Sequence, residues 1–277
     1  MAVSEKLRIH QLGPGDIDGG MALSTEAGWN QTADDWRHFI EKGRAIGVRA
    51  EGRLIASAAA LPYDGPFGFI GMVLVTPRFR RQGIATALVD RCIEELQGRG
   101  LTPALDATAD GAKVYAQQGF LAQFGFDRWE GTLEGPPSAA VEGTSPELER
   151  IAGLDAAAFG AARPALLKAF MRREGTRTLL SKDGDGFAMI RLGRRALQAG
   201  PVVAPSEGGA LDLLERLFAG VRGRVFIDVP SVWHGIARWL GERGFAIQRS
   251  FTRMALGRAE PFGSPQRLFA VAGPEFG

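Results

Sequence analysis

The sequence predicts an α/β protein with a mixed sheet, made of two tandem copies of one folding unit. The chain has 277 residues, close to the length at which one hydrophobic core stops growing and chains divide into domains. Segments typical of strands alternate with amphipathic helical segments. The same order recurs after a segment rich in Gly, Pro, Ser and Glu between about residues 134 and 146, which predicts a linker.

The first copy, residues 1–134, is expected to begin with two helices, over 18–30 and 32–43. Thr32 is the predicted N-cap of the second helix, because Asp34 and Asp35 follow in its first turn. The next segments predict a sheet with two crossover helices, in the following order. Two strands surround the turn 51–53, a third covers 67–75, a helix covers 83–100, a strand covers 101–108, a helix covers 110–119, and a strand pair covers 120–133.

The second copy, residues 145–277, repeats this order from "ELERIAGLDAAAFG" to "FAIQRSFTRMAL". One offset places Gly119 over Gly244 and Gly83 over Gly208. With a shift of three residues, Asp106 also lies over Asp228. A recurrence of this kind indicates a tandem duplication.

Composition excludes several classes of protein. Lys and Arg exceed Asp and Glu by only 33 to 31, so nucleic acid or an anionic membrane is not expected as the main partner. Cys92 is the single cysteine and there are three histidines, which makes an internal disulfide impossible and a metal site unexpected. No apolar run has the length of a signal peptide or a membrane span. A cytoplasmic protein is the default expectation.

The segment "TPRFRRQGIATALVD", residues 76–90, predicts an anion site. A strand ends at Val75, a loop with three arginines follows, and a helix starts near Gly83. A helix N-terminus offers free N–H groups and partial positive charge, and the arginines add fork-shaped donors. Gly83 allows a ligand to approach the backbone. A pyrophosphate fits this arrangement better than a carboxylate does; the alternative is a solvated basic loop.

The loop contains neither G-x-x-x-x-G-K-[ST] nor G-x-G-x-x-G, which disfavours nucleotide kinases and dinucleotide enzymes. Residues 80–85, "RRQGIA", instead resemble the [Q/R]-x-x-G-x-[G/A] loop of the GNAT acetyltransferase superfamily, and "YAQQGF" at 115–120 resembles its Tyr-x-x-x-Gly-Phe segment. The resemblance implies two GNAT folds and acetyl-CoA as co-substrate, bound where the fourth strand separates from the fifth. It implies these cofactor-binding residues: Val73, Leu74, Val75, Arg80, Arg81, Gln82, Gly83, Ile84, Ala85 and Thr86.

The resemblance also implies that Tyr115 is the catalytic acid that protonates the leaving thiolate of CoA. A tyrosine with its ordinary pKa of about 10 is protonated at neutral pH and can do this; the alternative is a packed helix tyrosine. The attacking amine needs a base, and Asp106 and Asp35 are both candidates. Asp106 could also cap the following helix, which is the favoured interpretation.

The loop after the first helix would line the acceptor site in this superfamily. Trp29 and Asn30 are therefore candidate substrate residues, with packing as an equal alternative. Trp36 is expected in the core because of its helical spacing with Ile40, and Cys92 is expected to be a small core residue. His10 and His38 are expected to be exposed to solvent.

The second copy lacks the features of the anion site. "VVAPSEGG" has no arginine, Glu207 places negative charge where a pyrophosphate would lie, and Leu240 replaces the tyrosine. We expect a degenerate GNAT unit that does not bind acetyl-CoA in this way. It could wall the acceptor pocket, or it could complete a hydrophobic interface with the first unit. Asp228 and His234 are candidate substrate residues there. The favoured interpretation is structural: Asp228 is the N-cap of a helix, and Trp233 lies in the core.

The expected activity is N-acetylation of a primary amine of a small molecule by direct attack in a ternary complex. The alternatives are a non-catalytic acyl-CoA binding or sensing module, or acetylation of a protein amine. The oligomeric state is left open.

Overall fold

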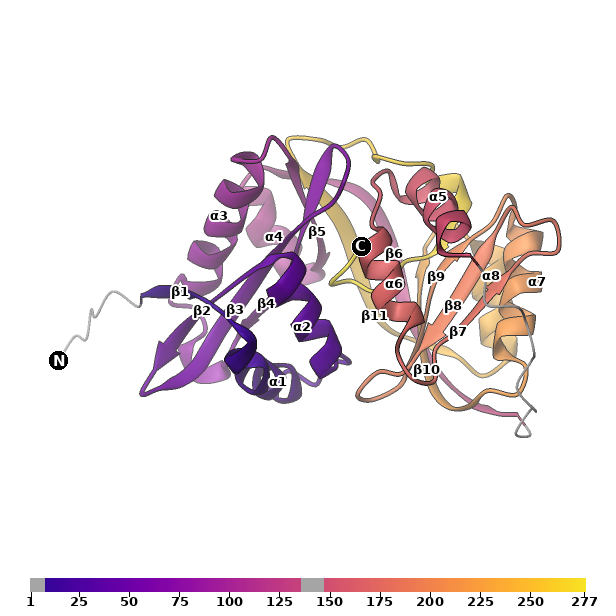
Figure 1. Ribbon diagram of the computed structural model, residues 1–277, viewed down its shortest axis with the longest axis horizontal. Helices are drawn as coiled ribbons and strands as arrows, with labels where there is room; N and C mark the ends of the chain where they lie inside the picture. The colour runs from indigo at the N-terminus through magenta and orange to yellow at the C-terminus, as the bar shows by residue number, and fades with distance from the viewer. Residues whose placement is uncertain (1–7, 136–146) are drawn as a thin grey trace.

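The computed structural model describes residues 8–135 and 147–277, so most of the predicted linker lies outside the described residues. Figure 1 shows two lobes side by side, with strands β6 and β11 between them. All twelve strands of the described residues belong to one sheet, in the order β1-β2-β3-β4-β5-β11-β6-β10-β9-β8-β7, with β12 paired to β9. The mixed α/β architecture agrees with the sequence prediction.

The first half contains the expected helices in the expected order among the strands, with β1 added at the start and one strand in place of the expected pair over 120–133. Its elements are β1 (Ile9–Gln11), η1 (Pro14–Asp16), α1 (Ile17–Glu26), α2 (Ala33–Lys42), β2 (Arg44–Ala50), β3 (Arg53–Pro62), β4 (Phe67–Val75), η2 (Pro77–Phe79), α3 (Ile84–Gln97), β5 (Thr102–Thr108), α4 (Ala109–Gln117) and β6 (Phe120–Glu134). Thr32 caps α2 as predicted, since its hydroxyl accepts from the Asp35 amide and Asp35 accepts from the Thr32 amide.

The second half repeats the pattern with an added C-terminal segment. Its elements are α5 (Leu148–Phe159), α6 (Pro164–Met171), β7 (Arg177–Leu180), β8 (Phe187–Arg191), β9 (Leu197–Val203), α7 (Glu207–Phe218), β10 (Arg222–Pro230), α8 (His234–Glu242), β11 (Ala246–Leu256), η3 (Pro265–Arg267) and β12 (Leu268–Ala270).

The two halves exchange their last long strands. β11, from the second half, pairs with β5 of the first, and β6, from the first half, pairs with β10 of the second. β6 and β11 also pair with each other along most of their length. The prediction of a strand pair over 120–133 was wrong, because this segment is one strand of 15 residues. Its length matches its pairing with two strands of the second half, because β11 pairs with residues 120–130 and β10 with residues 126–134.

Two buried ion pairs follow from the strand exchange. Asp106 lies opposite Arg253 in the β5–β11 register, and Asp228 lies opposite Arg128 in the β10–β6 register. Each arginine binds both carboxylate oxygens of its aspartate, at 2.8 Å. The expectation that these aspartates cap helices was wrong. Thr108 caps α4 through the Gly111 amide, and Trp233 occupies the N-cap position of α8.

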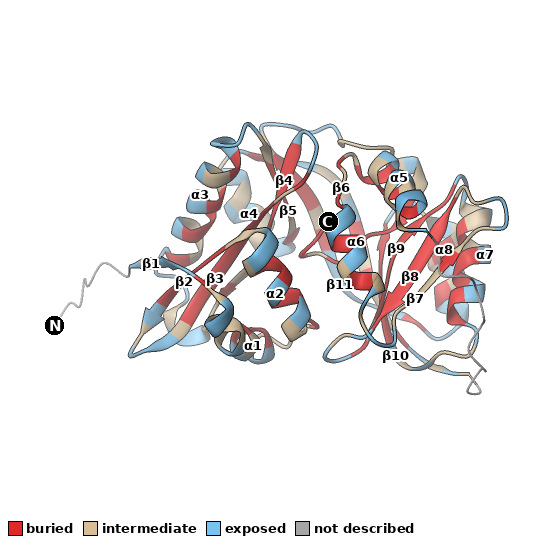
Figure 2. Cartoon of the chain, in the orientation of Figure 1, coloured by how far each residue is buried: buried red, intermediate tan, exposed pale blue. Residues whose placement is uncertain are grey.

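The core extends across the junction between the halves. Figure 2 shows buried residues along the central strands and on the inner faces of the helices. One cluster joins Trp36 and Phe39 of α2 to Phe170 of α6 and Phe276 near the C-terminus. Trp36 and Cys92 are buried, as predicted. The same cluster therefore holds the two halves together.

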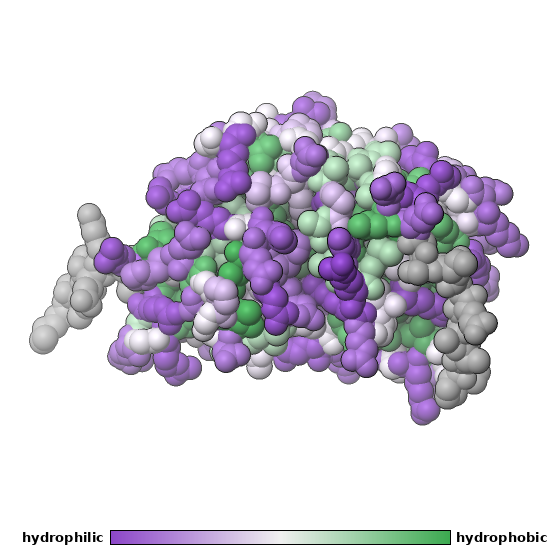
Figure 3. All heavy atoms as spheres, viewed as in Figure 1, coloured by the Kyte–Doolittle hydropathy of each residue, from purple (hydrophilic) through white to green (hydrophobic). Residues whose placement is uncertain are grey.

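The outer surface is mostly polar in the view of Figure 3, with hydrophobic residues in smaller patches. Among the helices of residues 8–135 and 147–277, none is long and apolar enough to cross a membrane.

Candidate active site

A groove opens where β4 and β5 separate. Their parallel pairing ends at Ile70 and Leu105, although β4 continues to Val75 and β5 to Thr108. The groove has a volume of about 650 Å³. Val73, Leu74 and Val75, which are predicted to bind the cofactor, line it. Because β5 no longer pairs with this part of β4, a ligand can hydrogen-bond to its backbone as an added strand would.

A bulge in β4 produces this separation. The β3–β4 register shifts between Ser57 and Ala59, and Met72 has a left-handed φ of 55°. The Ser57 hydroxyl donates to the Met72 carbonyl at 2.8 Å, which helps to hold the irregular backbone. A bulge bends a strand and re-aims its side chains and backbone groups. Here it marks the point where β4 leaves its neighbour.

The basic loop lies at the outer end of the groove. Arg80, Arg81, Gly83, Ile84, Ala85 and Thr86 line the groove, whereas Gln82 does not. Gly83 is the N-cap of α3, with φ of 77° and no side-chain cap. Arg80 Nε donates to the Val75 carbonyl at 3.0 Å, which holds this arginine against the strand end. An uncapped helix N-terminus beside two arginines has the donors and the charge to bind a phosphate group.

Tyr115 lies where the groove meets a second, more enclosed cavity. It comes from α4 and lines both spaces. Burial raises its pKa from 10 to about 12, because the charged phenolate is disfavoured away from water. The phenol therefore remains protonated at neutral pH, as a proton donor must.

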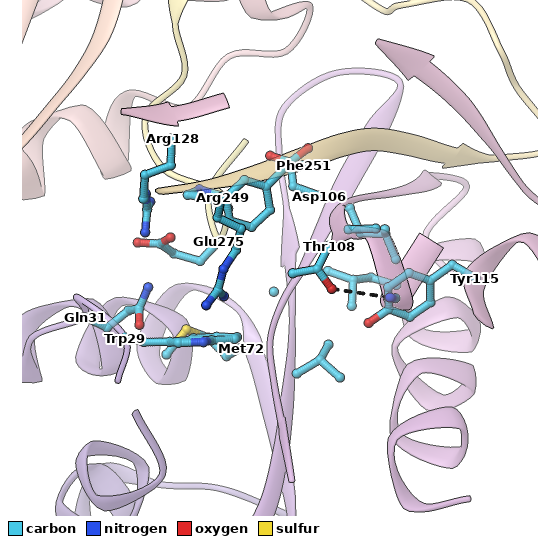
Figure 4. Close-up of a pocket in the computed structure, with 17 residues that line it drawn as sticks. Trp29, Gln31, Met72, Asp106, Thr108, Tyr115, Arg128, Arg249, Phe251 and Glu275 are labelled. Atoms are coloured by element: carbon cyan, nitrogen blue, oxygen red, sulfur yellow. Dashed lines mark hydrogen bonds between the residues drawn. The ribbon is translucent and has the colours of Figure 1, made fainter. Parts of the chain in front are cut away.

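The second cavity has a volume of about 130 Å³ and receives residues from both halves. The first half supplies Trp29, Gln31, Met72, Asp106, Thr108, Tyr115 and Arg128, and the second half supplies Arg249, Phe251, Pro274 and Glu275. Figure 4 shows Glu275 on one side of this cavity and Tyr115 on the other. A compact molecule in this cavity would therefore lie next to the inner end of the groove.

The segment after β12 runs between the halves and brings Glu275 to the cavity. The Phe276 carbonyl accepts from the Tyr63 hydroxyl at 2.7 Å and from Arg163 Nη1 at 3.0 Å. The Phe276 ring stacks on Phe39, with centroids 4.9 Å apart. Gly71 of β4 lies so close to the Glu275 carbonyl that a Cβ there would be 2.5 Å from that oxygen. These contacts hold Glu275 in place from both sides.

Glu275 is buried, and its pKa is raised above the ordinary value for a glutamate, first of all by desolvation. Asp35 raises this pKa further, whereas Arg191 and Arg128 lower it. Neither sequence motif nor repeat indicated Glu275, because the segment that carries it has no counterpart in the first copy. It contacts β4 at Gly71, about two hundred residues earlier in the chain.

The five predicted substrate residues have different surroundings. Trp29 and Asp106 line the cavity, but Asp106 is fully engaged by Arg253. Asn30 does not line it and instead binds the second half, because its Oδ1 accepts from the amides of Arg195 and Ala196. Asp228 lies behind Arg128, and His234 is exposed at the start of α8; neither lines the cavity.

Two further predictions concern α2. Asp35, a candidate base, forms an ion pair of 2.6 Å with Arg173 and does not line the cavity. The prediction that His38 is exposed was wrong, because it is buried where the halves meet, near Phe276. Desolvation first, then Arg173, lowers its pKa from 6.5 to about 4. His10 is exposed, as predicted.

The equivalent region of the second half is occupied by the chain itself. β12 pairs with β9 at Val202 and Val203, and the Val271 amide donates to the Asp228 carbonyl of β10. Trp233 fixes this segment, because its Nε1 donates to the Leu268 carbonyl at 2.8 Å and its ring packs on Phe269. The core role favoured for Trp233 agrees with these contacts.

The helix N-termini of the second half also have internal partners. Ser206 caps α7 through the Gly209 amide. The Glu207 carboxylate accepts from the Ile236 amide at the start of α8, at 3.0 Å. Leu240, at the position of Tyr115, is fully buried.

A split sheet, a basic loop at a free helix N-terminus and a half-buried tyrosine form the arrangement expected of an acyltransferase that binds an acyl-CoA. Two models of that class match this chain, an acetyltransferase (GNAT) family at residues 20–126 and an acetyltransferase (GNAT) domain at residues 151–270. The chain belongs to the GNAT acetyltransferases, with two GNAT units in tandem, and is an acyltransferase.

Relatives extend over nearly the whole chain. The uncharacterised N-acetyltransferase YitH of Bacillus subtilis is 25% identical, covering 88% of each chain. Holothin acyltransferase of a Pseudoalteromonas species is 25% identical, covering 90% of this chain and 87% of its own. Among solved structures, a candidate acetyltransferase from Pyrococcus horikoshii has a TM-score of 0.82 at 23% identity, and the match covers 100% of this chain and 98% of that one. A tandem GNAT protein from the clavulanic acid biosynthesis pathway has a TM-score of 0.59 at 16% identity, and the match covers 90% of this chain and 98% of that one.

Proposed function

We propose that this protein transfers an acetyl group from acetyl-CoA to a primary amine of a small molecule, with acetyl-CoA in the groove of the first half and the amine at the same time in the adjoining cavity. The observation that carries the proposal is the continuity of two spaces. The groove beside α3 and the more enclosed cavity share the lining residues Trp29, Val73, Thr108, Gly111, Tyr115 and Arg249. A thioester at the inner end of the groove would face an acceptor in the cavity, so direct attack needs no movement of the acyl group between sites.

The residues of the groove fit acetyl-CoA. The N-terminus of α3, Arg80 and Arg81 would hold the pyrophosphate. The backbone of Val73 to Val75 would bind the pantetheine amides and the thioester carbonyl. A backbone N–H aimed at that oxygen stabilises the negative charge that develops on it during attack. Tyr115 would then give its proton to the departing sulfur.

The enclosed shape of the cavity favours a small acceptor over a protein tail. The volume of about 130 Å³ and the walls from both halves leave room for a compact group and not for a peptide backbone with its side chains. One relative is named for its action on holothin, which is consistent with an acceptor that is a defined compound. We assign the first half the catalytic role and the second half the role of completing the acceptor wall.

The test is incubation of the full chain with acetyl-CoA and a panel of primary amines, followed by detection of released thiol. We expect thiol release that depends on both the protein and an amine, with the acetylated amine identified by mass spectrometry. Measurement of CoA affinity by calorimetry accompanies the assay. CoA binding without turnover on a broad panel would favour a binding or sensing module, and turnover with lysine peptides alone would favour a protein acceptor.

A further inference from the structure

We propose that Glu275 binds the ammonium group of the acceptor and removes its proton, so that the acceptor is an alkylamine that is protonated in solution. This assignment rests on the proposed function, because it concerns the acceptor side of the same site. Glu275 lies in the second half, on the segment after β12, and therefore gives that half a chemical role in the reaction.

The carboxylates of the cavity differ in their partners. Asp106 and Glu275 are the two acidic residues that line it. Asp106 has its bidentate ion pair with Arg253. Within the described ranges, Glu275 has no ion pair within 4 Å. A buried carboxylate without a counter-ion is costly and is retained where a ligand supplies the positive charge.

The other charged groups around Glu275 either have partners of their own or lie at the solvent-exposed opening of the cavity. Arg128 is bound to Asp228, Asp35 is bound to Arg173, and Arg191 donates to the carbonyls of Gly200 and Ala272. Arg249 lines the cavity from β11 but is exposed. The enclosed part of the cavity therefore has an unpaired negative group and room for a cation.

Gln31 gives a second indication of a hydrogen-bonding ligand. It is 4% exposed and lines the same cavity, and its Oε1 has no hydrogen-bond partner among residues 8–135 and 147–277. Figure 4 shows Gln31 and Glu275 on the same side of the cavity. A buried amide oxygen without a donor costs free energy. An ammonium group has three N–H donors, so one that binds Glu275 keeps donors for other acceptors of the cavity.

The proton balance of the reaction is closed by two residues. The ammonium gives one proton to the Glu275 carboxylate, and the neutral nitrogen forms a bond to the acyl carbon of acetyl-CoA. The carbon–sulfur bond breaks, and the sulfur takes the proton of Tyr115. The second proton of the new amide nitrogen returns to Tyr115, and Glu275 releases its proton to solvent. A raised pKa makes Glu275 a stronger base than an exposed glutamate, which assists the first step.

The first test is binding to the protein saturated with CoA, which does not depend on turnover. The probes are 2-phenylethylamine and its neutral analogue 2-phenylethanol, measured by calorimetry. Glu275→Gln is expected to weaken the binding of 2-phenylethylamine by about tenfold or more. The affinities for 2-phenylethanol and CoA should stay unchanged. Glu242→Gln, at the exposed end of α8, is the matched control. Equal weakening of both probes, or no binding of the amine to the wild-type protein, would overturn the assignment.

The second test separates the base from a packing role. Glu275→Gln is expected to lower kcat/KM for an alkylamine by about 100-fold. The same variant should have little effect on aniline, which is a neutral amine and not an ammonium ion at neutral pH, so it needs no base before attack. In the wild type, kcat/KM for the alkylamine should rise with pH through the raised pKa of Glu275, and this rise should be absent in the variant. Glu275→Asp should restore part of the rate.

An equal loss for alkylamine and aniline would overturn the base assignment and indicate a structural role. Failure of the proposed function is distinguishable: there, no amine would release thiol, while the binding difference between the amine and the alcohol could still be measured.

Discussion

The two halves contain the same strand–turn–helix unit, and the difference between them lies in what satisfies the start of the helix. In the first half, α3 begins after Gly83 without a side-chain cap, beside Arg80 and Arg81. In the second half, α7 begins after Ser206, which caps it. A helix N-terminus with free N–H groups can bind an anion, whereas the side chain of Ser206 already satisfies one of these donors in α7. The first unit is therefore suited to a phosphate, and the second is complete without one.

The adjoining gaps in the sheet differ in the same way. The space between β4 and β5 is an open groove. The space between β9 and β10 holds β12 and Val271 of the same chain. A strand that fills the gap through its own backbone occupies the place where an extended ligand would bind. After filling that gap, the chain continues to the first half and supplies Glu275. The second unit has thus lost room for a ligand and contributes to the site of the first.

The strand exchange joins the two halves through two buried ion pairs. Breaking one of these pairs should give the largest of the expected changes, a loss of unfolding free energy. Arg253→Met leaves Asp106 buried without its counter-ion, which we expect to cost about 3–5 kcal/mol of unfolding free energy. Arg128→Met should cost a similar amount because Asp228 is equally buried. Chemical denaturation measures both. A loss below about 1 kcal/mol for Arg253→Met would contradict a structural role for the pair.

Tyr115 and Leu240 occupy equivalent positions and should differ in their effect on catalysis. Tyr115→Phe removes the proton donor and is expected to lower kcat by about 100-fold, with the affinity for CoA nearly unchanged. Leu240→Met, which conserves volume in the core of the second half, should leave kcat unchanged. Steady-state kinetics and calorimetry measure these quantities. An unaltered rate in Tyr115→Phe would remove this residue from the mechanism.

The basic loop gives the smallest expected change. Arg81→Glu reverses a charge in the groove and is expected to weaken CoA binding by about tenfold. Arg238→Glu, at an exposed position on α8, makes the same change in the second half and should have no effect. The salt dependence of the wild-type affinity should be reduced in Arg81→Glu. An unchanged dissociation constant would contradict the assignment of the loop to the pyrophosphate.

Much of the groove could be predicted from the sequence because its determinants are local. Gly83 with a left-handed φ, the arginines before it and the strand that ends at Val75 lie within nine residues of one another. The capping of α2 by Thr32 and the burial of Trp36 and Cys92 also depend on local pattern. The assignments of these residues to acetyl-CoA and of Tyr115 to acid catalysis stay predictions for the experiments above.

The cavity that we propose for the acceptor could not be predicted, because it depends on contacts between distant segments. Asn30 was a plausible pocket residue by position, but the loop at residues 193–196 takes its hydrogen bonds. Asp106 and Asp228 looked like helix caps, since nothing in the sequence indicates that each lies opposite an arginine from the other half. The sequence around His38 is typical of an exposed position, but in the fold Phe276 and Arg173 of the second half lie next to it.

The sequence by itself determined the two units, the loop with its glycine and arginines, and the loss of that loop in the second unit. Helix starts, turns and periodicity are set by neighbours in the chain, so they can be recognised without a fold. Only the tertiary structure decided that β6 and β11 change places, that β12 fills the second gap, and that Glu275 reaches the cavity. These features depend on the packing of segments far apart in the chain, which no local pattern encodes.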